Sequence, residues 1–125
     1  MLGNCGKEDD VKDYASAAQL LRSGEIGLFI FTDGRDLEIN EDGSGSTGTW
    51  PMDRRRRFDR VFIYHRVSES GAQLLAARPA ALDGPDDNNE YVIKFYGARI
   101  VGKTSANWRK FAATHSYPIR YIERE

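Results

Sequence analysis

Residues 59–66, DRVFIYHR, hold four consecutive apolar side chains between charged or polar flanks. A strand with one wet face alternates apolar and polar residues, whereas a short unbroken apolar run is typical of a strand covered on both faces. Residues 26–32, IGLFIFT, have the same character and are followed by Asp33 and Gly34, which favour a turn. These two stretches predict the central strands of a β-sheet.

Four further stretches extend this sheet. Residues 35–40 alternate, with Leu37 and Ile39 on one side, and predict a strand with one wet face. Residues 72–82 and 90–101 predict the two arms of a hairpin, because the turn-forming cluster DGPDDNN separates them. Pro79 places the first arm at an edge or a bulge, and residues 117–122 predict a last strand.

Two helices are expected to pack against the sheet. Asp9 or Asp10 can cap an N-terminal helix whose apolar residues recur every three or four positions up to Leu21. Thr104 or Ser105 can cap a short helix near the C-terminus. Its inward side chains are Trp108, Phe111 and Ala112.

These elements predict an α+β fold in a small single domain, residues 1–125, with a mostly antiparallel or mixed β-sheet that could curl into a partial barrel. Residues 1–8 are predicted to form a disordered tail. Residues 41–49, EDGSGSTGT, are predicted to form a flexible loop because glycine, serine and threonine dominate them.

Composition excludes several classes of protein. A net charge of -1 excludes a uniformly basic nucleic-acid coat. The single cysteine, Cys5, excludes an internal disulfide, and with only His65 and His115 a four-ligand Cys/His zinc site cannot be assembled. We assign no catalytic residue, metal site or cofactor. No stretch is apolar enough for a membrane span or an export signal, so we expect a cytoplasmic protein.

Charge is distributed unevenly along the chain. Residues 51–82 hold seven basic and three acidic side chains, and residues 94–125 hold seven and two, whereas residues 1–50 and 83–93 are net acidic. If the basic segments lie side by side, they form a positive face beside Trp50, Tyr64 and Tyr96, which suits a phosphate backbone with stacked bases. Alternatively, acidic and basic segments pair across neighbouring strands.

The leading hypothesis is therefore a non-enzymatic binding module for nucleic acid or another polyanion. Four consecutive arginines in particular offer forked donors that match phosphate, although Asp36, Glu38, Glu41 and Asp42 could neutralise them instead. The candidate phosphate contacts are Arg54, Arg55, Arg56, Arg57, Arg60, Lys94, Arg99, Lys103, Arg109 and Lys110, and the candidate stacking residues are Trp50, Tyr64 and Tyr96.

Two other classes of function stay open. A small protein-interaction or immunity-type protein would use the acidic loop or the edge at Pro79, and the oligomeric state is not predicted. The third class is enzymatic: residues 97–104, GARIVGKT, match the phosphate-loop pattern GxxxxGK(S/T). The β-branched Ile100 and Val101 favour instead a strand up to Val101 with a turn at Gly102. A metal-dependent nuclease could use the polar residues Asp36, Glu38, Glu90 and Lys94.

Overall fold

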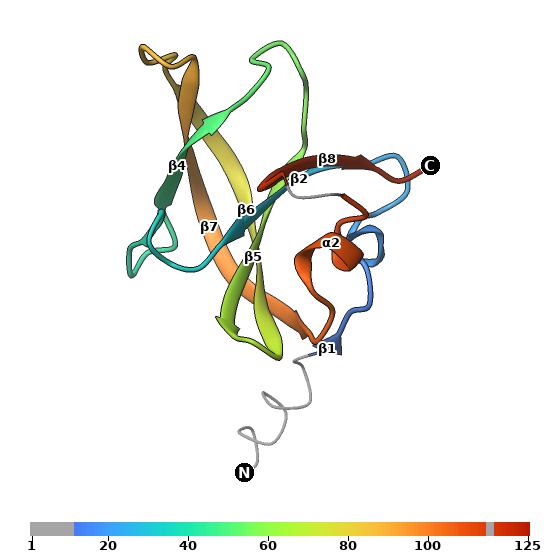
Figure 1. Cartoon of the computed structure of the whole chain (residues 1–125). Helices are drawn as coiled ribbons and strands as arrows, with labels where there is room; N and C mark the ends of the chain where they lie inside the picture. The colour runs from blue at the N-terminus through green and yellow to red at the C-terminus, as the bar shows by residue number, and fades with distance from the viewer. Residues whose placement is uncertain (1–11, 115–116) are drawn as a thin grey trace.

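The computed structural model describes residues 12–114 and 117–125, which form mainly one curved β-sheet (Figure 1). The strands are β1 (Lys12–Asp13), β2 (Ile26–Thr32), β3 (Leu37–Ile39), β4 (Gly45–Pro51), β5 (Arg60–Ser68), β6 (Gly71–Asp83), β7 (Glu90–Thr104) and β8 (Ile119–Glu123). Their order across the sheet is β3-β4-β7-β6-β5-β2-β8, and β1 pairs in parallel with β7. Two short helical segments, η1 (Ala17–Leu20) and α2 (Trp108–Phe111), accompany the sheet. None of the described helices is long and apolar enough to cross a membrane.

The two apolar runs are central strands, as predicted. β5 lies between β2, with which it runs parallel, and β6, with which it runs antiparallel. Phe62 and Tyr64 point to a core shared with Phe29 of β2, while Val61 and Ile63 point to a second core on the opposite face. Each face of these strands therefore meets apolar partners, which explains why neither run alternates.

The two cores have different covers. α2 and η1 cover the first core, which Trp108, Phe111 and Ala17 join. The second core lies inside the curve of the sheet, where Leu37 of β3 and Ile119 of β8 pack against the same cluster. Because β3 and β8 are the two ends of the strand order, the sheet curls until residues from both of its ends contact one core.

Bulges in the long β6–β7 hairpin accompany this curl. The register between the two strands shifts at three places, between Leu74 and Leu75, between Ala76 and Arg78, and between Pro79 and Ala81. Ala77 is the last residue along β6 that pairs with β5, and Pro79 comes after it. The predicted edge or bulge at Pro79 is thus confirmed, because its missing N–H is tolerated there.

The predicted α+β class and the N-terminal helix are wrong, since the structure is 54% strand and 7% helical. Lys12 and Asp13 form strand β1 against β7, and only η1 is helical before β2. The ring of Tyr14 packs over Gly102, where a Cβ atom would lie 2.5 Å from the ring. The first described residues of the segment that was predicted to be helical therefore form a strand with β7 instead. Val11, Asp9, Asp10 and the predicted tail lie outside the described residues.

The predicted flexible loop over residues 41–49 is wrong for residues 45–49, which belong to β4 and pair with β7. Glycine is required in β4 because neighbouring groups pack closely against its backbone. A Cβ atom on Gly45 would collide with the carbonyl oxygen of Glu38 and would lie 2.8 Å from the ring of Phe95. Residues 41–44 form the β3–β4 turn, in which the N–H of Asn40 donates to the carbonyl of Ser44 at 2.8 Å.

The short C-terminal helix is present, but its predicted cap is wrong. Asn107 caps α2, because its side-chain oxygen accepts the N–H of Lys110 at 2.9 Å. The expected caps at Thr104 and Ser105 fail because β7 continues to Thr104, so the turn expected at Gly102 does not form either. The predicted inward residues Trp108, Phe111 and Ala112 are buried as expected.

The central position of β5 is testable by truncation. Ile63→Ala should lower the free energy of unfolding by about 2 to 5 kcal/mol, because Ile63 is fully enclosed in the second core. Val67→Ala on the same strand, where the side chain is 62% exposed, should change it by less than about 0.5 kcal/mol. Urea denaturation measures both. Equal effects of the two variants would contradict the position of β5.

Candidate functional site

Two of the three candidate stacking aromatics are core residues. Trp50 is 9% exposed and donates from Nε1 to the hydroxyl of Thr47 at 3.1 Å. Tyr64 is 3% exposed and donates its hydroxyl to the carbonyl of Ala106 at 2.6 Å. The expectation that both rings are wet is therefore wrong, because strand alternation turns each toward a core. Tyr96, at 51% exposed, remains at the surface.

Arg60 is held inside the protein. Its guanidinium donates from Nε and Nη2 to the two carboxylate oxygens of Glu25, each at 2.7 Å, and also to the carbonyl of Leu20. Both side chains are largely buried, with 14% and 12% exposed. The hydrogen bonds from Arg60 lower the pKa of Glu25 below its ordinary value. This geometry makes Arg60 a structural cation that joins β5 to the η1–β2 turn.

The remaining predicted cations do not form one continuous patch. Arg55 pairs with Asp53 at 3.3 Å, and Lys94 pairs with Asp83 at 2.9 Å across the β6–β7 hairpin. Lys103 lies at the opposite end of β7, beside β1, roughly 30 Å from Lys94 along an extended strand. Arg99 lies between these positions on β7. Arg109 and Lys110 are exposed on α2.

The arginine run occupies the connection between β4 and β5, which arches from β4 toward β8 (Figure 1). The guanidinium of Arg56 lies 4.3 Å from the centre of the Tyr121 ring on β8. Among the described residues, no ion pair joins this run to the acids around β3. Those acids, which the sequence offered as internal partners, are Asp36, Glu38, Glu41 and Asp42.

A pocket lined by several arginines lies where this connection joins β5. It has a volume of about 390 Å³, and we call it the arginine pocket. Its charged lining residues are Arg22, Arg60, Arg78, Arg99, Glu25 and Asp59. Both acids are already engaged, Glu25 by Arg60 and Asp59 by the backbone N–H of Ile26 at 2.8 Å. In the described part of the chain, no ion pair neutralises the other three arginines.

A second pocket lies at the other end of the same connection. It has a volume of about 400 Å³ and is lined by Pro51, Met52, Asp53, Asn89, Tyr117, Pro118, Ile119 and Tyr121. We call it the seam pocket, because it lies where the end of β4, the tip of the β6–β7 hairpin and the start of β8 converge. Sequence reasoning missed it. The one local signal was Tyr117, an aromatic residue placed between a helix and a strand and followed by proline.

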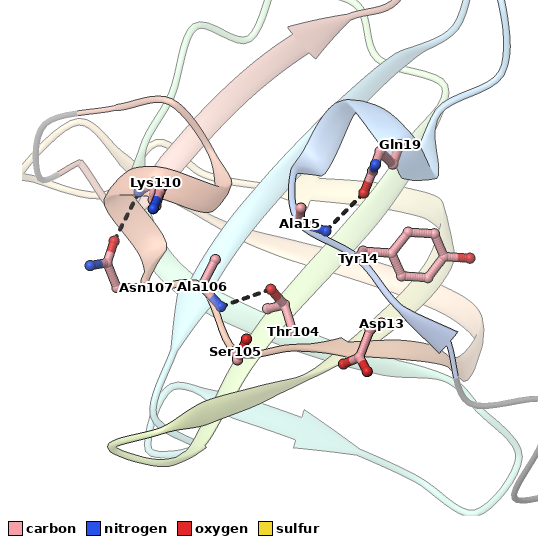
Figure 2. A pocket seen from close by; sticks show the side chains of 9 residues that line it. All are labelled: Asp13, Tyr14, Ala15, Gln19, Thr104, Ser105, Ala106, Asn107 and Lys110. Atoms are coloured by element: carbon pink, nitrogen blue, oxygen red, sulfur yellow. Dashed lines mark hydrogen bonds between the residues drawn. The ribbon is translucent and has the colours of Figure 1, made fainter.

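The pocket in Figure 2 lies between the β1–η1 segment and the β7–α2 turn, with a volume of about 570 Å³. Its polar side chains are used locally. Gln19 accepts the N–H of Ala15 at 2.8 Å, Thr104 accepts that of Ala106 at 3.0 Å, and the side chain of Asn107 accepts an N–H of α2. These groups end or begin short elements, so this pocket has a structural explanation.

The phosphate-loop match does not form a loop. Residues 97–104 lie within β7, paired with β6 and, at Gly102 and Lys103, also with β1. A phosphate loop needs successive N–H groups turned around an anion, which a paired strand cannot provide. Thr104 is buried as well. For the nuclease hypothesis, the described residues include no cluster of three His, Cys, Asp or Glu that could hold a metal ion.

Comparisons with known proteins do not indicate a function. No protein-family model matches the chain, and no curated protein or solved structure is significantly similar to it. The function is therefore argued from the two pockets and the arginine connection between them.

The Glu25–Arg60 pair makes the stability depend on pH. Glu25→Gln should lower the free energy of unfolding by about 2 to 4 kcal/mol at pH 7, because it leaves the largely buried Arg60 without its carboxylate. The folded-state pKa of Glu25 is lowered, so the wild-type advantage is complete above the ordinary value of 4.5 and is lost as the pH falls through the folded value.

Urea denaturation at pH 7, 5 and 3 measures this difference. The matched control is Glu38→Gln on the exposed strand β3, which should change stability little at any pH. A difference between wild type and Glu25→Gln that is as large at pH 3 as at pH 7 would contradict the assignment.

Proposed function

We propose that this chain is a non-enzymatic nucleic-acid-binding module whose phosphate contacts surround the connection between β4 and β5. The contacts are Arg54, Arg56 and Arg57 of the connection together with Arg22, Arg78 and Arg99 of the arginine pocket. Arg60 and the buried rings of Trp50 and Tyr64 are left out, because their groups are occupied inside the protein.

One observation carries this proposal: all six of these arginines are exposed, and within the described residues none has an ion-pair partner. Guanidinium groups of the run repel one another, as do those that line the arginine pocket, wherever they lie within the Debye length of about 8 Å. A polyanion relieves this repulsion, and the forked donors of arginine match phosphate oxygens. Binding is thus favoured by charge without any rearrangement of the fold.

The acids are gathered in two other places. The β3 edge and its turn carry Asp36, Glu38, Glu41 and Asp42, and among the described residues none of these forms an ion pair with the arginine connection. The tip of the β6–β7 hairpin carries Asp83, Asp86, Asp87 and Glu90 and adjoins the seam pocket through Asn89. A nucleic acid is therefore attracted to the guanidinium groups of the connection and repelled from both acidic segments.

A protein partner is the second candidate. Val67 and Ile100, at 62% and 53% exposed, line a further pocket of about 420 Å³ at the end of the sheet where β5 turns into β6. Exposed apolar side chains of this kind mark protein-interaction surfaces in many proteins. This surface lies on other elements than the arginine connection, so binding that ignores salt and requires Ile100 would favour this candidate.

Salt dependence tests the proposed function. If all six arginines contact phosphates, log K for a single-stranded oligonucleotide should fall with log salt with a slope of roughly -4. Arg54→Ala and Arg57→Ala should each flatten this slope by roughly 0.7. Arg35→Ala is the matched control. Arg35 precedes β3 in the chain and forms an ion pair with Asp33 at 2.6 Å, so this substitution should not change the slope.

Fluorescence anisotropy with labelled single-stranded and duplex DNA and RNA measures these affinities at low salt. Absence of binding to all four ligands at about 100 micromolar protein would overturn the proposal and favour the protein partner.

A further inference from the structure

We infer that the seam pocket takes up one unstacked base of a bound single strand, stacked on Tyr117. This inference rests on the proposed function and adds the chemical part of the ligand that the arginines do not recognise. Phosphate contacts position a strand, whereas contacts to bases distinguish nucleic acid from other polyanions.

Tyr117 offers an exposed aromatic face on a fixed backbone. Its side chain is 70% exposed, the largest exposure among the large apolar side chains of the described residues. Its carbonyl accepts the indole N–H of Trp108 at 2.6 Å, and the next carbonyl, that of Pro118, accepts the N–H of Phe31 at 2.8 Å. The ring is thus presented at the pocket with little backbone freedom to lose on stacking.

Tyr121 links the pocket to the arginine connection. It lines the pocket, and the guanidinium of Arg56 lies 4.3 Å from the centre of its ring. Its hydroxyl oxygen is fully buried, so a base in the pocket contacts the ring of Tyr121 and not the hydroxyl.

The rest of the lining fits a base. Met52 and Ile119 provide apolar contacts, and Asn89 provides both a donor and an acceptor. Asp53 provides a carboxylate, whose pKa hydrogen bonds from Arg55 lower further. A carboxylate accepts from the exocyclic amino group of cytosine but repels the carbonyl at the same position of thymine or uracil. Cytosine should accordingly bind more tightly than uracil.

The phosphate of the same nucleotide has a neighbouring partner. Arg56 stacks on the ring of Tyr121, and Arg54 immediately follows Asp53 of the pocket wall. A base in the seam pocket therefore places its own phosphate close to two exposed guanidinium groups. This adjacency of an aromatic pocket and exposed arginines is typical of sites that track a single strand.

An abasic strand separates the two claims. Wild-type protein should bind an oligo-dC strand at least tenfold more tightly than an abasic strand of equal length, as measured by anisotropy at fixed salt. Tyr117→Ala should bring the affinity for oligo-dC down to that for the abasic strand and leave the latter unchanged. Val67→Ala, which truncates an exposed side chain outside the pocket and the arginine connection, is the control and should change neither affinity.

Each result has a separate meaning. Equal wild-type affinities for the two strands overturn the base pocket and leave the polyanion-binding function standing. If neither strand binds, the proposed function fails, and cytidine monophosphate then tests the pocket alone. An absence of shifts in the ring resonances of Tyr117 and Tyr121 up to about 10 millimolar nucleotide would then overturn the inference too.

Discussion

The parallel pairing of β2 with β5 is the constraint on which the rest of this structure depends. Gly27 lies opposite Arg60 and Thr32 lies opposite His65, so the chain must travel back the whole length of β2 before β5 can begin. Parallel neighbours usually make this return through a helix. Here the return consists of β3, β4 and the arginine connection, and it forms one wall of the second core through Leu37, Met52 and Phe58. The connection is therefore a structural necessity whose exposed side can carry charge.

The curl of the sheet and the separation of charge both follow from this path. β3 and β4 add to the far side of β7, and the β3 edge and its turn carry the acids Glu38, Glu41 and Asp42. The arginine connection then returns across the curve to reach β5, where Arg56 meets Tyr121 of β8. The two pockets that we propose as a binding site lie at the two ends of this connection. Exposed positive charge is thus collected at the place where the curl brings distant segments together.

Sequence patterns identified the elements whose interactions are local or repetitive. The apolar runs of β2 and β5, the β6–β7 hairpin and the burial of Trp108 and Phe111 were all predicted correctly. β4 was missed, because its glycines look flexible until the ring of Phe95 and the carbonyl of Glu38 occupy the space beside Gly45. The apolar spacing before Leu21 predicted a helix because pairing of residue 12 with Gly102 cannot be read from local periodicity. The predicted arginine run is exposed, whereas Trp50 and Tyr64 are buried, and the exposed ring that we propose for stacking, Tyr117, was not among the predicted residues. Whether each of these rings is buried or exposed depends on which face of the sheet its side chain points to, and this could not be predicted from the sequence.

Mapping the surface that a short single strand contacts is the most direct test of this account. A titration of isotopically labelled protein with an oligo-dC strand, followed by amide chemical shifts, reports every contact at once. The account predicts shifts confined to residues 51–60, 117–121 and the neighbourhood of Arg22, Arg78 and Arg99, with residues 36–42 and the surface around Val67 and Ile100 unchanged. Shifts concentrated at β3 or around Val67, with the arginine connection silent, would contradict it.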